Sequence, residues 1–195
     1  MQEFLRHVFG WVCGQNPAHT WTPGGELLPL CQRCTGVYAG ALVAGLLHLA
    51  WRPVPTLGWR WLNGVFLLFM LPSGRYWIPQ NPELRCSSGT LFGFGLVAFL
   101  WLTLPAEFAI CDLRFTRPLE VQAQRVNRKS QIVNFAGLLA TLVLVPLLAE
   151  NGNAVADGIL TVACVGGALT LAALLLANAF LLLRWLAWRI SARAA

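Results

Sequence analysis

The stretch RCTGVYAG, residues 33–40, opens an apolar segment, and RCSSGTLFG at residues 85–93 nearly repeats it. Each copy places an arginine, a cysteine and one or two hydroxyl residues before two glycines spaced four apart. Small residues at that spacing let two helix backbones approach closely in lipid. The repeat therefore predicts two membrane helices that pack at their starts. Two interpretations stay open: a packing pattern alone, or the duplication of a two-helix unit around one site.

The composition indicates a membrane protein. Of 195 residues, 57% are hydrophobic and only 11% are charged, and the mean hydropathy is +0.61. A soluble domain of this length needs more polar surface. The net charge of +6 is interpreted as loop charge that orients the chain in the lipid bilayer. Basic residues are dense only at RVNRK, residues 125–129, without interleaved aromatics, so no nucleic-acid partner is expected.

Five apolar runs follow along the chain, and each is a candidate membrane span. They cover about 35–51, 57–72, 89–104, 131–149 and 158–183, against the roughly 17–25 residues that a span needs. The second run is the weakest, because Arg60 and Pro72 bracket a short apolar core. We predict an all-α integral membrane helical bundle of about five transmembrane helices. Residues 1–34 form an N-terminal interfacial helix and Cys/His loop outside the membrane, and residues 35–195 form the transmembrane bundle.

The distribution of Lys and Arg predicts the orientation. If five spans alternate, ten basic residues share one side and four lie on the other. The ten are Arg52, Arg60, Arg114, Arg117, Arg125, Arg128, Lys129, Arg184, Arg189 and Arg193, and the four are Arg6, Arg33, Arg75 and Arg85. The positive-inside rule then predicts a multi-pass protein of the cell inner (cytoplasmic) membrane, with the N-terminus outside and the C-terminus in the cytoplasm. A protein partner or a homo-oligomer through the Gly-x-x-x-Gly faces is also left open.

Six cysteines are present, and four of them fall on the predicted outer side. Cys164 lies inside the fifth run as a small packing residue, and Cys111 lies in a cytoplasmic loop. The outer four are Cys13, Cys31, Cys34 and Cys86. A Cys-x-x-Cys pair, Cys31 and Cys34, begins the first span with Arg33 between the two thiols. A helix N-terminus and a neighbouring cation both favour the thiolate, which binds metals and attacks disulfides.

Three chemistries compete for these cysteines. The leading one is a zinc site, for which Cys13, His19, Cys31 and Cys34 make a Cys3His set with typical Cys-x-x-Cys spacing. The second is a membrane thiol-disulfide oxidoreductase that uses Cys31 and Cys34, exchanges with Cys13 or Cys86, and passes electrons to a quinone. The third is a structural disulfide such as Cys13–Cys34. Whether the protein is an enzyme stays open.

Two arginines occupy equivalent places in the repeated phrases. Arg33 and Arg85 would lie at two helix starts on the same side of the membrane. Two guanidinium groups beside helix N-termini attract an anion, so they predict a site for a lipid headgroup or a carboxylate. The alternative is that each side chain merely reaches the headgroup layer. The spans contain no Asp or Glu, which disfavours a proton-driven transporter.

The segments CGQNP and PLCQRCTGVYAG resemble the signature of the domain of unknown function 2085 family, bacterial and archaeal predicted membrane proteins. Its members open with Cys-His-Gln and continue with Cys-x-Arg-Cys-Thr-Gly-[Ile/Val]-Tyr-x-Gly. A later Arg-x-x-Thr-Gly-x-x-x-Gly is similar to RCSSGTLFG here. The resemblance covers roughly residues 10–105 and implies no settled activity. Gly14 stands where the family has its histidine, and His19 would have to replace it.

A second likeness is one of layout only. Quinone-linked disulfide oxidoreductases of the inner membrane also place Cys-x-x-Cys at the outer start of a membrane helix. Such chemistry would require Cys13 and Cys86 as the second cysteine pair, so this likeness is an analogy of fold and site.

Overall fold

The computed structural model describes residues 2–51, 56–103 and 120–194, and over these ranges the chain is helical without a strand. The elements in chain order are α1 (Gln2–Phe9), the short 3-10 helix η1 (Pro17–His19), α2 (Gln32–Ala50), α3 (Leu57–Leu68), α4 (Met70–Gly74), α5 (Pro82–Thr103), α6 (Glu120–Glu150) and α7 (Ala154–Ala194). The prediction of an all-α fold is confirmed. Cys111 and the basic residues at 114 and 117 lie outside the described residues.

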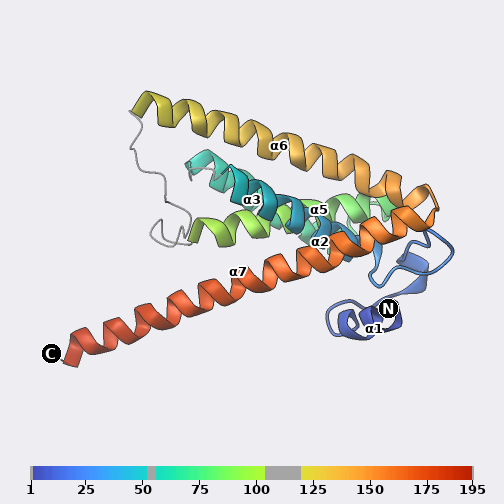
Figure 1. Ribbon diagram of the computed structural model, residues 1–195, viewed down its shortest axis with the longest axis horizontal. Coiled ribbons are helices and arrows are strands. Elements are labelled where there is room, and N and C mark those ends of the chain that lie inside the picture. Colours follow the sequence, from blue (N-terminus) through green and yellow to red (C-terminus); the bar gives the residue numbers. More distant parts are fainter. Residues whose placement is uncertain (1, 52–55, 104–119, 195) are drawn as a thin grey trace.

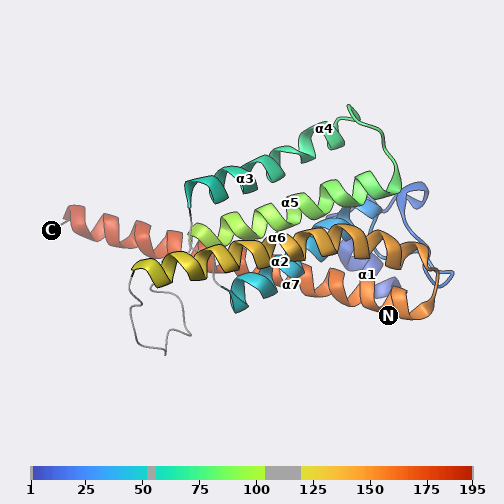
Figure 2. The same cartoon turned by 90° about the horizontal axis from the view of Figure 1, so that it is seen from above.

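Four helices are long and apolar enough to cross a membrane. These segments are Gln32–Ala50, Pro82–Trp101, Arg128–Glu150 and Ala154–Ala187. The predicted second run, 57–72, forms two consecutive helices, α3 and α4. Together they run alongside α5 (Figure 2). Pro72 has no N–H to donate to the carbonyl of Leu68, so one uninterrupted helix is disfavoured there. At 1.5 Å per residue the pair covers roughly 27 Å, close to a bilayer's hydrocarbon thickness.

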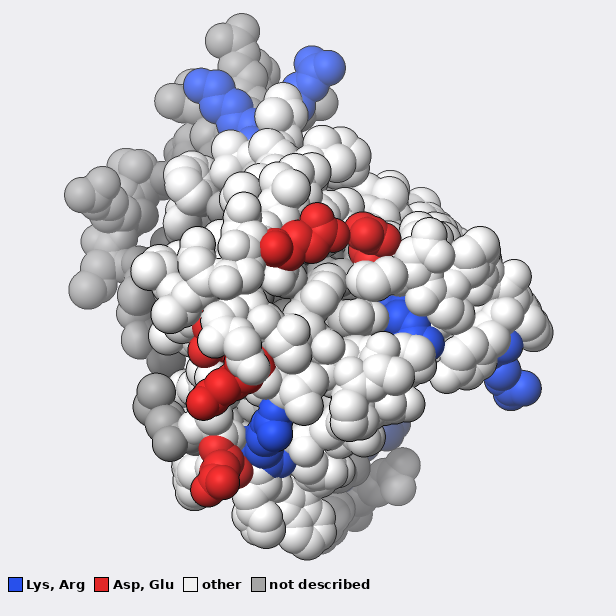
Figure 3. All heavy atoms as spheres, turned by 90° about the vertical axis from the view of Figure 1, so that its right-hand side faces the viewer, with Lys and Arg blue, Asp and Glu red and all other residues white. Residues whose placement is uncertain are grey.

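The helices run alternately up and down the bundle. Both α2 and α5 start at the end that carries the N-terminal loop, whereas α6 returns to that end and α7 leaves it (Figure 1). The chain ends therefore lie at opposite ends of the bundle (Figures 1 and 2). Figure 3 views the molecule from the end that carries the N-terminal loop. Positively and negatively charged side chains are scattered there over a mostly uncharged surface. This end of the bundle, where α2 and α5 begin together, carries both repeated motifs.

Four glycines bring the backbones of α2 and α5 together. A Cβ on Gly36 would collide with the carbonyl oxygen of Cys86, and a Cβ on Gly93 would collide with that of Val37. Gly40 and Gly89 face the opposite backbone equally closely. This is the close approach expected of glycines spaced four apart. Because the two glycine faces meet within one chain, an oligomer formed through them would first have to separate α2 from α5.

Candidate metal centre

Cys13 lies beside the start of α2 because it follows directly on the end of α1, which packs there. The Cys13 N–H donates to the carbonyl of Phe9 at 2.9 Å, which closes a turn after α1. The Phe9 ring lies against Tyr38 of α2, with the ring centroids 5.5 Å apart. Both Phe9 and Cys13 are 5% exposed. Packing of one aromatic residue thus fixes Cys13 beside the helix that carries the other two cysteines.

Gln15 holds the two arms of the N-terminal loop together. Its Nε2 donates to the carbonyl of Arg6 at 2.6 Å and to that of Pro29 at 2.9 Å. The Arg6 guanidinium donates in turn to the carbonyl of Leu27 at 2.8 Å. Gln15 has a φ of 44°, in the left-handed region that non-glycine residues rarely adopt. Two hydrogen bonds to opposite arms hold this conformation, so Gln15 serves as the clamp of the loop.

The middle of the loop is packed onto the bundle. The Leu28 N–H donates to the carbonyl of Trp21 at 2.9 Å, and both side chains are buried. The tip turns at Gly24 and Gly25, whose φ values are 85° and 90°. A Cβ on Gly24 would lie 3.3 Å from the Cα of Ala154, so the tip rests on the start of α7. The loop is therefore seated on the bundle rather than free of it.

Cys31 and Cys34 meet Cys13 at the N-terminus of α2. Cys31 occupies the N-cap position of α2. Its backbone N–H donates to the sulfur of Cys13 at 3.4 Å. Cys34 lies one turn further on. The three sulfur atoms all lie within 4.8 Å of one another. Sulfurs on a tetrahedral zinc ion, bound at about 2.3 Å, are roughly 3.8 Å apart, so a shift of about an ångström would suffice.

His19 does not join this group. Among the residues that the structure describes, the cluster of metal-ligating side chains contains the three cysteines alone. His19 is the last residue of η1, and its N–H donates to the carbonyl of Asn16 at 3.0 Å. The Asn16 side chain caps the same turn by accepting from the N–H of Ala18 at 3.0 Å. Three of the four predicted ligands thus converge, and the capped turn keeps the histidine out of the group.

The thiols polarise one another. Hydrogen bonding from the thiol of Cys13, and next from that of Cys34, holds the pKa of Cys31 well below its ordinary value. The pKa of Cys13 is raised, chiefly by its hydrogen bond to Cys31. The N-terminus of α2 also favours negative charge at Cys31. Cys31 is consequently the first of the three to become a thiolate, the form that binds a metal ion.

The described cysteines are free of disulfides, including both members of the Cys13–Cys34 pair considered from the sequence. Cys86 is fully buried in α5, where it packs with Trp21 and Leu28. It is not part of the three-cysteine group. A relay that pairs Cys13 with Cys86 therefore has less geometric support than exchange within the group itself.

The two predicted arginines lie at the same end of the bundle. The Nη2 atom of Arg33 donates to the carbonyl of Ser73 at 2.9 Å and to Oε1 of Gln80 at 3.0 Å. Arg85 is only 6% exposed, and its Cζ lies 5.9 Å from the centroid of the Tyr76 ring. Tyr76 was not singled out from the sequence. The one available signal was its place two residues after Pro72-Ser73-Gly74, a composition typical of turns.

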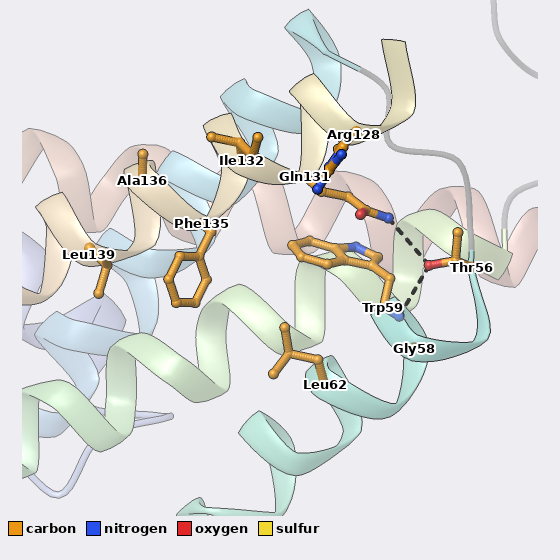
Figure 4. A pocket seen from close by; sticks show the side chains of 10 residues that line it. All are labelled: Thr56, Gly58, Trp59, Leu62, Arg128, Gln131, Ile132, Phe135, Ala136 and Leu139. Carbon is orange, nitrogen blue, oxygen red and sulfur yellow. Dashed lines mark hydrogen bonds between the residues drawn. The ribbon is translucent and has the colours of Figure 1, made fainter. Parts of the chain in front are cut away.

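A separate groove lies between the start of α3 and residues 128–139 of α6 (Figure 4). The start of α3 lies at the end of the bundle opposite the N-terminal loop (Figure 1). It has a volume of about 580 Å³, and the indole of Trp59 lies between the two helices. At its polar end, Oγ1 of Thr56 accepts from the N–H of Trp59 and from Nε2 of Gln131, each at 3.3 Å. Because this groove is at the other end of the bundle, it does not bring a quinone to Cys31.

No curated protein and no solved structure matches the chain. A family match does exist, and it begins at Cys13 and ends within α5, so it takes in the cysteine group and both arginines. Residues 13–99 match the family of predicted membrane proteins DUF2085, the family whose signature the cysteine motif resembles.

Proposed function

We propose that this multi-pass membrane protein binds one zinc ion through Cys13, Cys31 and Cys34, and that the ion fastens the N-terminal loop to the start of α2. The observation that carries the proposal is the convergence of three free sulfurs within 4.8 Å. Cys13 and Cys31 are 18 residues apart, so the chain has been folded back to join them. Thiolate ligands prefer zinc, copper(I) or iron–sulfur clusters, and the Cys-x-x-Cys spacing is typical of zinc.

A structural role suits the site better than a hydrolytic one. Cys13 is buried, and Cys31 and Cys34 are half-buried. The described group contains no carboxylate or imidazole that would act as a general base toward a zinc-bound water. A fourth ligand completes tetrahedral zinc. That ligand would be a water molecule in the arrangement of the described residues, or His19, the ligand that the sequence predicts, if η1 rearranges on binding the ion.

The orientation proposed from the basic residues adds a reason for a metal. With ten Lys and Arg residues on one side and four on the other, the positive-inside rule would place the cysteine end on the side of the inner membrane that faces away from the cytoplasm. Disulfides form and persist on that side. Three adjacent thiols would be oxidised there unless a bound ion held them as thiolates. Zinc would thus preserve the loop geometry that the structure shows.

Redox chemistry is the second candidate, and the proximity of Cys34 to the acidic thiol of Cys31 favours it. Oxidation of the two thiols to a disulfide releases two electrons and two protons. These would reduce a membrane quinone to its quinol. Such a protein would cycle between dithiol and disulfide forms and would not need a resident metal.

Elemental analysis of the full chain, purified in detergent without chelator, distinguishes the two candidates. The zinc proposal predicts about one zinc ion per chain and thiols that resist alkylation until a chelator is added. Cys13→Ser, Cys31→Ser and Cys34→Ser should each lose the ion, whereas the matched variants Cys86→Ala and Cys164→Ala should keep it. Metal-free protein that carries a Cys31–Cys34 disulfide as purified would overturn the zinc proposal in favour of redox chemistry.

The fourth ligand is tested by His19→Ala. If His19 completes the site, zinc affinity should fall by at least the roughly 10- to 100-fold that the loss of a group supporting a ligand causes. Unchanged affinity would assign the fourth position to water or to an external ligand. An open position of that kind would make a hydrolytic activity the better hypothesis.

A further inference from the structure

Arg85 is a buried cation whose counter-ion is missing from the described chain. Its side chain is 6% exposed, and its Nε is buried without a hydrogen-bond partner. Among the residues whose side chains the structure describes, no carboxylate forms an ion pair with it. Glu83, the nearest acidic residue along α5, is exposed. Burying an unpaired guanidinium costs several kcal/mol, so folded proteins pair such groups with an anion.

Arg33 is a second arginine at this end of the bundle, although one of its terminal nitrogens already donates hydrogen bonds within the protein. Its Nη2 donates to the carbonyl of Ser73 and to Gln80, while its Nε is also buried without a partner. The Ser73 hydroxyl lies 2.8 Å from that of Ser88, which donates to the carbonyl of Arg85 at 2.9 Å. These hydrogen bonds tie α2, which carries Arg33, and α5, which carries Arg85, to Ser73 of α4, so both arginine-bearing helices are joined to the same short helix.

Tyr76 lies over the guanidinium of Arg85 and has a strained backbone conformation. It follows α4 with a φ of 59°, a backbone conformation that glycine adopts freely and tyrosine does not. The turn is closed by the Trp77 N–H, which donates to the carbonyl of Pro72 at 3.0 Å. The phenol ring lies over the guanidinium of Arg85, and the residue is 66% exposed. Residues held in such strained conformations cluster at ligand and active sites, so the strain at Tyr76 supports a site here.

We propose that Arg85, Arg33 and Tyr76 form a binding site for a phosphate-type oxyanion at the start of α5. The planar guanidinium of Arg85 would bind two oxygens of the anion, and the free Nε of Arg33 would donate to a third. The N–H groups of Glu83 and Leu84 precede the first internal hydrogen bond of α5, from Arg85 to the carbonyl of Asn81, and would be available to the same anion. The phosphate belongs either to a lipid headgroup or to a free ion.

The test uses the full chain, stripped of lipid in a neutral detergent. Inorganic phosphate is titrated at constant ionic strength, with chloride as the reference anion, and the midpoint of thermal unfolding is recorded. Saturating phosphate should raise the midpoint by roughly 5 °C or more. Arg85→Gln should abolish the rise. The matched variant Arg75→Gln, which removes an exposed arginine one residue before Tyr76, should keep it.

A second arm separates the two sources of phosphate. The same proteins are placed in nanodiscs of phosphatidylglycerol or of phosphatidylcholine, and retained lipid is counted by native mass spectrometry. Retention of phosphatidylglycerol by wild type but not by Arg85→Gln would assign the site to an anionic headgroup. A response to inorganic phosphate in detergent, with no lipid preference, would assign it to the free ion.

Two further variants keep the inference testable if Arg85→Gln does not fold. Arg85→Lys retains the charge without the fork, so about tenfold more phosphate should be needed for the same shift. Tyr76→Gly removes the ring and relieves the backbone, so the protein should stay folded while its response to phosphate weakens. If neither phosphate nor phosphatidylglycerol stabilises the wild-type protein, Arg85 is buried without a ligand and the inference is wrong.

Discussion

The contact between α2 and α5 gives the sharpest stability prediction, at Gly93. A methyl group there would lie within 3.0 Å of three backbone atoms of Val37, whereas ordinary contacts are 3.4–4 Å. Backbone atoms cannot rotate away as a side chain does, so the helices would have to separate. Overpacking costs up to about 3 kcal/mol, and alanine recovers about 1 kcal/mol of helix propensity over glycine. Gly93→Ala should therefore lower the free energy of unfolding by about 2 kcal/mol.

The measurement is tryptophan fluorescence during SDS-induced unfolding in mixed micelles, with Gly158→Ala as the matched control. Gly158 lies on α7 with nothing within 4 Å of its added Cβ, so alanine there should be neutral or stabilise by up to about 1 kcal/mol. The two glycine-to-alanine changes should thus differ by about 2–3 kcal/mol. Equal stability of the two variants would refute the close approach of α2 and α5 at Gly93.

Three other predictions concern the loop and the helix caps. Gln15→Ala removes both hydrogen bonds that hold the two sides of the N-terminal loop together and leaves a non-glycine residue in the left-handed region. Cys13 of the metal-free protein should therefore be alkylated several-fold faster, and an unchanged alkylation rate would contradict this role of Gln15. Thr56→Ala should cost about 1 kcal/mol because it removes the cap of α3 and its bond to Gln131, and a loss below the error of SDS unfolding would count against it. Asn153→Ala should cost a similar ~1 kcal/mol, since Oδ1 of Asn153 accepts from the N–H of Ala156 at the start of α7; exchange of the Ala156 amide hydrogen should rise.

Features encoded by short spacing were predictable from the sequence. Apolar length gave the membrane helices, and the repeated glycines gave the close approach of α2 and α5. The break inside residues 57–74 follows from Pro72, which a count of apolar residues does not register. Because successive membrane helices run in opposite directions, the order of the apolar runs also predicts that α2 and α5 start at the same end of the bundle. The sequence thus predicts the bundle because each of these signals acts within a few turns of one helix.

The candidate site was predictable only in part. The convergence of Cys13 with Cys31 and Cys34 was expected, whereas the exclusion of His19 depends on how Asn16 caps η1. The partners of Arg33 lie 40 and 47 residues further along the chain, so no local pattern reveals them. The burial of Arg85 and the strained backbone of Tyr76 are likewise products of the path of the chain between α4 and α5.

X-ray absorption at the zinc edge, measured on the full chain purified without chelator, tests the central claim most directly. The proposed centre predicts three sulfur neighbours at about 2.3 Å and one nitrogen or oxygen neighbour at about 2.0–2.1 Å. Serine at Cys13 should abolish this sulfur shell, and alanine at Cys86 should leave it unchanged. A protein that holds no zinc, or zinc surrounded by nitrogen and oxygen alone, would contradict a metal centre built by Cys13, Cys31 and Cys34.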